Sequence, residues 1–420
     1  MVSRQQARWL GGCLVLVVLV SGIMIVRSRP ARVFAGTIPV GPKPQQVALD
    51  TRTGYAFVTN SFTSSVSMLD SGSGAVLHTI TVSPQPEEVA LDTRTRRAFV
   101  VNNNGDVNVL DTTIGTVLRT FNIEPSAGGL DLCEVVVAAQ TNRVLVVMGS
   151  GDTPSILTFL DARTGAVLRQ VPVGRYAHTV AVDERVGRVF TANLTDSTVS
   201  VLDLGSGHAL RTVRVSAGPL EVAVDERTGR AFATDADGSV SMLDTRDGAV
   251  LRTVAVGGSP TELSVDAVTG HVFVLLNPGV ATLDARTGAV LRTVAVGNTP
   301  TGTIVHNPQD IVVDARTSRV FVTELTDAVS VLDARSGKVL GRLPAGNGPV
   351  ALALDEANNQ LLVVNPVGTD PQNGGRTPRS GWAWVPPGLR RWLPWLSSPA
   401  PAPAPLTSIG GVTVLDTSHL

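Results

Sequence analysis

The chain has 420 residues, with 34 Lys and Arg against 35 Asp and Glu, 43% hydrophobic residues and only 4% aromatic residues. The hydrophobic fraction excludes a disordered chain, and two cysteines, Cys13 and Cys133, exclude a disulfide framework or a cysteine-based zinc cluster. Beyond residue 32 the net charge is −6, which argues against nucleic-acid binding through a general basic surface.

The first 32 residues predict a membrane segment. Trp9–Val26 is an uncharged run of 18 residues, just long enough to cross a bilayer as a helix, and arginines flank it on both sides. We expect an uncleaved transmembrane helix. The alternative is a signal cleaved after Val33-Phe34-Ala35, which would give a secreted protein. Either interpretation places the rest of the chain outside the cytoplasm, and a single cysteine there suits an oxidising compartment.

Residues 33–420 contain one unit repeated eight times. Each copy has a strand that ends in Val-Leu-Asp or a close variant, and the usual spacing is 41 or 42 residues. Each copy also has four short runs of β-forming residues separated by turn residues. Four strands in about 40–45 residues is the size of a propeller blade. The sequence therefore predicts an all-β, eight-bladed β-propeller, with seven blades as the alternative.

The repeated aspartates and phenylalanines predict structural roles. Asp50–Gly54 and Asp284–Gly288 predict hairpin loops, because Asp accepts hydrogen bonds from turn N–H groups and Gly adopts positive φ. Asn142 stands at the glycine position of the third copy. The phenylalanines share one position of the second strand and are expected to pack between blades. They are Phe57, Phe99, Phe190, Phe232, Phe273 and Phe321.

Several second strands resemble the Tyr-Val-Thr-Asn signature of the YVTN β-propeller repeat family. The matching segments are Phe57–Asn60, Phe99–Asn102 and Phe190–Asn193, and the resemblance covers most of residues 33–365 and 411–420. It implies a propeller that is surface-exposed or secreted and acts as a binding or scaffold module. A WD40 propeller is disfavoured, because no Trp falls inside a repeat.

The two ends of the repeat region are expected to share the last blade. The chain ends with a third strand, Val412–Asp416, and Val33–Val40 resembles the missing fourth strand. Two connections in each unit keep a constant length, and antiparallel order places both on one face of the ring, the turn face. All insertions fall on the opposite face, the insertion face, which we expect to bind partners and to point away from the membrane. The insertions are Asn122–Leu132, Gly149–Ser155, Thr301–Gln309 and Pro366–Gly410.

One position at the start of each first strand is expected to line the channel mouth on the insertion face. Five carboxylates there predict a ligand site for a cation, an amine or a Ca²⁺ ion. The alternative is strand-end charges paired with local arginines. His178 and His306 are candidates for acid–base chemistry, or ordinary surface histidines. The eight residues are Gln46, Glu88, Glu134, Thr179, Glu221, Glu262, Asp310 and Ala351.

The insertion at about 366–410 holds four of the five tryptophans, and exposed Trp with Arg is typical of interfaces. It predicts an arm that binds an envelope protein or a glycan. The alternatives are a disordered loop and packing of the Trp side chains on the rim. The residues are Trp382, Trp384, Arg390, Arg391, Trp392 and Trp395.

These features predict a monomeric, membrane-anchored, extracytoplasmic module with segment 1–32 and a propeller over 33–420. We expect a non-catalytic binding or scaffold protein of the cell envelope, without a cofactor and without nucleic acid. The alternative is a lactonase-type hydrolase that uses the acidic channel mouth and His178. The sequence contains no Cys-x-x-Cys-His haem site and no nucleophile elbow.

Overall fold

The computed structural model describes residues 35–123, 132–149, 153–296, 308–324, 327–366 and 410–418, together with the backbone of β1 (Val18–Leu19) and β2 (Gly22–Ile23). The chain divides into two units, Met1–Arg32 and Val33–Leu420. In the first unit the described backbone is the antiparallel pair of β1 and β2.

The helix expected over Trp9–Val26 is not seen in the described part of this run. The residues described there form strands, and their Val and Ile are branched at Cβ, which favours strands. The rest of the run lies outside the described residues. Within the described ranges, no helix has both the length and the apolar character needed to cross a membrane.

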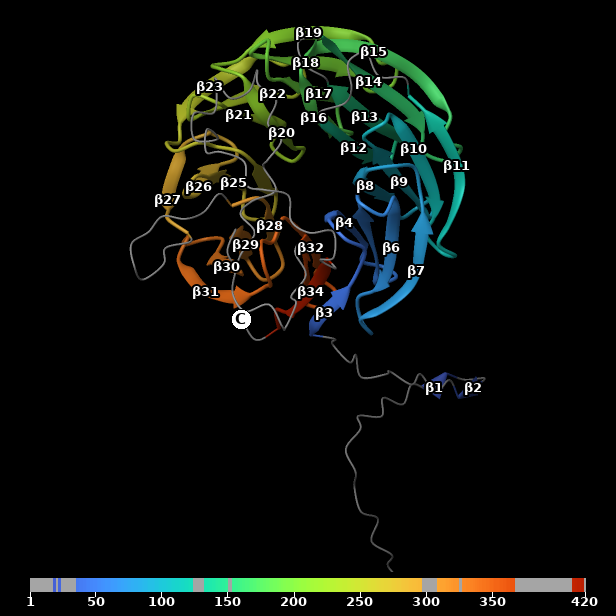
Figure 1. Ribbon diagram of the computed structural model, residues 1–420. Coiled ribbons are helices and arrows are strands. Elements are labelled where there is room, and N and C mark those ends of the chain that lie inside the picture. Colours follow the sequence, from blue (N-terminus) through green and yellow to red (C-terminus); the bar gives the residue numbers. More distant parts are fainter. Residues whose placement is uncertain are drawn as a thin grey trace, which may run out of the picture. The chain divides into compact units, whose positions relative to one another are not determined.

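The second unit is a ring of eight four-stranded antiparallel sheets, the blades, each with its first strand innermost (Figure 1). Blade 1 is β4 (Pro44–Asp50), β5 (Tyr55–Asn60), β6 (Ser65–Asp70) and β7 (Ala75–Thr81). Blade 2 is β8 (Pro86–Asp92), β9 (Arg97–Asn102), β10 (Asp106–Asp111) and β11 (Thr116–Asn122). Blade 3 is β12 (Leu132–Ala138), β13 (Arg143–Gly149), β14 (Pro154–Asp161) and β15 (Val167–Arg175). Blade 4 is β16 (Ala177–Asp183), β17 (Arg188–Asn193), β18 (Thr198–Asp203) and β19 (Ala209–Arg214).

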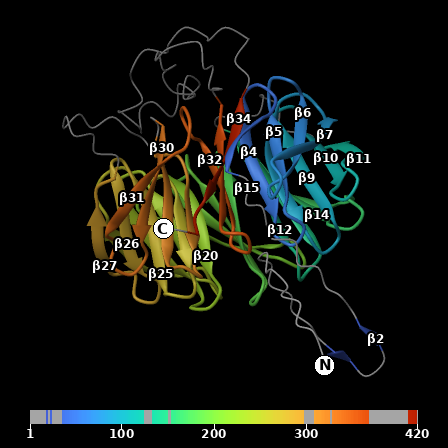
Figure 2. The same ribbon diagram turned by 90° about the horizontal axis from the view of Figure 1, so that it is seen from below.

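The remaining four blades follow the same order, and Figure 2 shows the ring from the side. Blade 5 is β20 (Pro219–Asp225), β21 (Arg230–Asp235), β22 (Ser239–Asp244) and β23 (Val250–Ala255). Blade 6 is β24 (Leu263–Asp266), β25 (His271–Leu276), β26 (Gly279–Asp284) and β27 (Val290–Val294). Blade 7 is β28 (Ile311–Asp314), β29 (Arg319–Glu324), β30 (Ala328–Asp333) and β31 (Val339–Pro344). Blade 8 is β32 (Ala351–Asp355), β33 (Gln360–Asn365), β34 (Gly411–Asp416) and β3 (Gly36–Pro39).

The prediction of eight blades and of a shared last blade is confirmed. β3 pairs antiparallel with β34 from Gly36 opposite Val414 to Pro39 opposite Gly411. In Figure 1 the blue β3 lies beside the red β34. Ile38 of β3 is 1% exposed and packs in a cluster that joins blade 8 to blade 1. The chain's early strand therefore closes the ring.

Eight apolar clusters hold neighbouring blades together, one at each of the eight contacts around the ring. The six second-strand phenylalanines are at most 2% exposed. Phe57, for example, packs with residues of blade 2, such as Val89. Their predicted role in packing between blades is confirmed.

The turn face is built as the aspartate pattern predicts. In blade 1 the Asp50 carboxylate accepts a hydrogen bond from the N–H of Arg52 at 3.0 Å, and Gly54 and Asn142 both have positive φ. In all eight blades the N–H that follows the third strand donates to the carbonyl oxygen of the 1–2 turn, at 2.8–3.2 Å. Ser71 donates to Gly54 in this way. The two constant turns of each blade therefore lie side by side on one face.

The last residue of the second strand holds the 2–3 connection on the insertion face. Asn60 donates from Nδ2 to Ser67 at 3.0 Å, and Asn193 donates in the same way to Ser200 at 2.8 Å. Blade 5 has Asp235 at this position, which is fully buried and accepts a hydrogen bond from Ser241 at 2.6 Å. Burial raises the pKa of Asp235 to about 7.

Shortening the buried side chain of the closing strand tests ring closure. Ile38→Ala is expected to lower the free energy of unfolding by about 2–4 kcal/mol, because it leaves a cavity between blades 8 and 1. Thr37→Ala in the same strand removes an exposed side chain and one hydrogen bond to Thr413, and should cost about 1 kcal/mol or less. Urea denaturation measures both, and equal effects would contradict the role assigned to Ile38.

Replacing Asp235 by the amide found in other blades tests its buried charge. The raised pKa means that stability is fully present below the ordinary pKa near 3.8 and is lost as pH rises toward about 7. Asp235→Asn should therefore change little at pH 4 and raise the free energy of unfolding by about 2–4 kcal/mol at pH 8. Asn193→Asp is the matched reverse change and should introduce the same pH dependence into blade 4. A pH-independent effect of Asp235→Asn would refute this account.

Candidate functional site

The first strands of the eight blades surround the centre of the ring (Figure 1). The predicted mouth residues belong to these strands or directly precede them. Glu88, Glu134, Glu221, Glu262 and Asp310 are half-buried. Thr179 and Ala351, the small residues of the set, are 6% and 3% exposed. Water thus reaches carboxylates that protein atoms largely surround.

Buried threonines of the second strand fix the backbone of this position. The N–H of Glu221 donates to Thr234 Oγ1 at 3.0 Å, and the N–H of Asp310 donates to Thr323 Oγ1 at 2.9 Å. In blade 1, Thr59 accepts from Gln46 N–H and donates to the Glu87 carbonyl of blade 2 at 2.9 Å. In blades 1, 5 and 7 the threonine of the Tyr-Val-Thr-Asn pattern therefore positions the mouth residue, and in blade 1 it also links neighbouring blades. This role was not predicted from the sequence, although Thr59, Thr234 and Thr323 recur at one position of the second strand.

Two mouth carboxylates reach across to the next blade. Glu134 Oε2 accepts the N–H of Val180 at 2.6 Å, and Asp310 Oδ2 accepts the N–H of Leu352 at 2.6 Å. In both cases the next blade has a small residue at the mouth position, which leaves room for the longer side chain. Glu262 differs, because its Oε2 is buried without a hydrogen-bond partner among the described residues.

The five carboxylates act on one another electrostatically. Burial, together with the neighbouring Glu134 carboxylate, raises the pKa of Glu88 to about 8. Burial raises the pKa of Glu134 to about 7 and that of Asp310 to about 6. Burial, with Glu134 among the like-charged neighbours, raises the pKa of Glu221 and of Glu262 well above the ordinary value. Several of these carboxyl groups are therefore protonated at neutral pH, and a positive charge nearby would favour their ionised forms.

The remaining expectations concern ion pairs of the mouth carboxylates, metal binding, the two histidines and the tryptophan arm. None of the five carboxylates forms an ion pair in the described ranges, so the expected alternative of pairing with local arginines is not observed. Among described residues, no three His, Cys, Asp or Glu side chains are placed to hold a metal ion. The side chain of His178, the whole of His306 and the tryptophan arm lie outside the described residues. The hydrolase alternative and the binding arm therefore stay predictions.

The connections that carry the predicted insertions all leave and enter the ring on one face. They join β11 to β12, β13 to β14, β27 to β28 and β33 to β34, so each runs between strand ends on the insertion face. The mouth residues lie at this same face, because first strands begin there. The acidic mouth and the variable connections therefore share one side of the ring.

Fold and site together define a class, a closed eight-bladed β-propeller with an acidic channel mouth. The family described as outer membrane protein assembly factor BamB matches residues 27–254 and 187–357, and the chain belongs to this family. This membership supports a β-propeller family without extending to the YVTN surface-layer type that the sequence resembles. A comparison with curated proteins gives no match.

Solved structures show the same fold. The crystal structure of the computationally designed Ika8 protein aligns with a TM-score of 0.63, and BamB from Moraxella catarrhalis aligns with a TM-score of 0.60. Each is 16% identical in sequence, and each alignment covers 78% of this chain and 95% of the other. At this identity the likeness establishes the fold alone.

Removing one mouth carboxylate tests the shared charge. The pKa of Glu88 is raised, so its contribution to stability is present below about pH 4.5 and is lost as pH rises toward about 8. Glu88→Gln should leave the free energy of unfolding nearly unchanged at pH 4 and raise it by about 2 kcal/mol at pH 9. Asp284→Asn is the control with the opposite sign, because hydrogen bonds from Thr287 lower the pKa of Asp284. Loss of stability in Glu88→Gln at pH 9 would mean that a bonding partner holds the carboxylate.

Proposed function

We propose that the protein is a non-catalytic scaffold of the cell envelope, attached to the membrane through residues 9–26, that binds an envelope partner through its insertion face. Membership in the BamB family supports an envelope role. The variable connections support the choice of face, because a rigid ring presents its variable loops for binding.

The observation that carries the proposal is the group of five coupled carboxylates at the channel mouth. They are half-buried, have raised pKa values and form no ion pair in the described part of the chain. A cationic group that enters the mouth exchanges for these protons and removes the repulsion between like charges. The ligand class that fits is therefore an amine or another compact cation, including a Lys or Arg side chain of a partner protein.

Isothermal titration of the full chain with spermidine, and separately with Ca²⁺, tests the cation site. Binding should strengthen from pH 6 to pH 8, by roughly tenfold per pH unit for each proton released. The heat should also depend on the ionisation enthalpy of the buffer, which reports proton release directly.

The double variant Glu221→Gln/Glu262→Gln should lose most of this binding. Glu356→Gln, which removes one carboxylate from the turn face, is the control and should bind as the wild type does. Absence of heat with both cations, or equal weakening in the control, would refute the cation site. The envelope role would then rest on family membership alone.

A further inference from the structure

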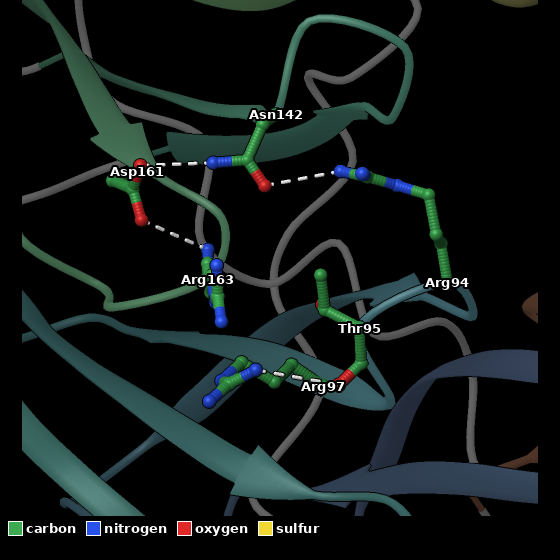
Figure 3. Close-up of a pocket in the computed structure, with 6 residues that line it drawn as sticks. All are labelled: Arg94, Thr95, Arg97, Asn142, Asp161 and Arg163. Carbon is green, nitrogen blue, oxygen red and sulfur yellow. Dashed lines mark hydrogen bonds between the residues drawn. The ribbon is translucent and has the colours of Figure 1, made fainter.

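A second site lies on the turn face, at the contact of blades 2 and 3. A cleft of about 590 Å³ opens there between the 1–2 turn of blade 2 and the turns of blade 3. In Figure 3, Arg94 reaches Asn142 from one side, whereas Arg97 and Arg163 lie below Asp161. The six lining residues are Arg94, Thr95, Arg97, Asn142, Asp161 and Arg163.

The cleft has three guanidinium groups and one carboxylate. Asp161 already accepts hydrogen bonds from the N–H groups of Arg163 at 3.0 Å and Thr164 at 2.7 Å. It also accepts one from Asn142 Nδ2 at 2.8 Å, and hydrogen bonds from Thr164 lead the effects that hold its pKa below the ordinary value. The carboxylate is therefore ionised and occupied by its own turn, and the lining keeps an excess of positive charge.

Five blades begin the second strand with an arginine, and within the described ranges two of these arginines form an ion pair. Arg97 is one of the three that do not. Arg188 and Arg230, which also begin a second strand, pair with the third-strand carboxylates of Asp203 at 3.3 Å and Asp244 at 2.9 Å. Arg97 lies opposite Asp111 in the same register but donates instead to the carbonyl oxygen of Thr95 at 3.3 Å. Within the described ranges neither Arg97 nor Arg163 forms an ion pair, whereas Arg94 lies 4.0 Å from Asp92.

Two further residues in the turns at this contact depart from the repeat. Seven blades end the first strand with an aspartate that is at most 1% exposed, such as Asp92, but blade 3 has Ala138 there. Blade 2 also places Arg96 in the left-handed region, with φ of 58°, where several other blades have Gly. A bulky residue in this conformation is strained, and strained residues cluster at functional sites.

We propose that this cleft binds an anionic group with several oxygens, of the phosphate type. Guanidinium groups donate in pairs to such oxygens, and two arginines without carboxylate partners face one opening. The site lies on the opposite face from the acidic mouth and does not depend on the function proposed for that mouth. A free phosphate compound and a phospholipid headgroup share this chemistry.

Titration of the full chain with pyrophosphate at low salt tests the site. The double variant Arg97→Gln/Arg163→Gln should weaken binding by roughly 30-fold or more, because each charge-assisted hydrogen bond lost costs about tenfold. Arg286→Gln/Arg335→Gln is the control, because both residues occupy the position of Arg163 in other blades and the change in net charge is the same. The control should weaken binding by less than about threefold, and thermal melting should show all variants folded.

Cosedimentation with vesicles separates the two sources of the anion. Phosphatidylcholine vesicles give the background, and vesicles that also contain phosphatidylglycerol present an anionic headgroup. Loss of the preference for phosphatidylglycerol in Arg97→Gln/Arg163→Gln supports the site with a headgroup as ligand, and loss of pyrophosphate binding alone supports it with a free phosphate compound. Equal weakening in the control variant, or no effect of the double variant on either probe, would overturn the proposal.

Discussion

The pairing of β3 with β34 is the contact on which the rest of the ring depends. Each blade buries its apolar faces only against its two neighbours, so an open ring would expose one side of blade 8 and one side of blade 1. The pairing supplies the fourth strand of blade 8 and buries Ile38 in the cluster between these two blades. Closure also sets the channel, because the eight first strands surround a common centre only in a complete ring.

The two faces of the ring follow from strand direction, and they differ in chemistry. The insertion face carries the channel mouth, where burial and like charge raise the pKa values of carboxyl groups. On the turn face the carboxylates are held by turn N–H groups, and several of their pKa values are lowered. Acidic side chains are thus partly protonated at neutral pH on the insertion face, whereas those with lowered pKa values on the turn face stay ionised.

Much of the ring was predictable from sequence, because the same pattern of turn residues and β-forming residues recurs in each of the eight repeats. The aspartate turns, Asn142 in a glycine position and the buried phenylalanines all follow from residue type and spacing. The strands β1 and β2 were not predicted, and a helix was expected over Trp9–Val26 instead. Hydrophobic length alone does not separate a helix from strands that contain Val and Ile.

The sites depend on contacts between blades, which the pattern within one repeat does not encode. The mouth carboxylates could be aligned from sequence, but their coupling and the reach of Glu134 to Val180 required the ring geometry. The arginine cleft combines turns from two repeats, and its positive charge comes from three arginines that line it beside the single carboxylate of Asp161.

The closing strand also has a consequence for biosynthesis. Thr37 and Thr413, which bond to each other in blade 8, lie 376 residues apart in the sequence. A growing chain on the ribosome exposes β3 long before β34 exists, and the intervening blades must stack while both edges at the seam remain unpaired. Because unpaired strand edges recruit other chains, the interval before the last strand emerges is when a nascent molecule most needs protection by chaperones.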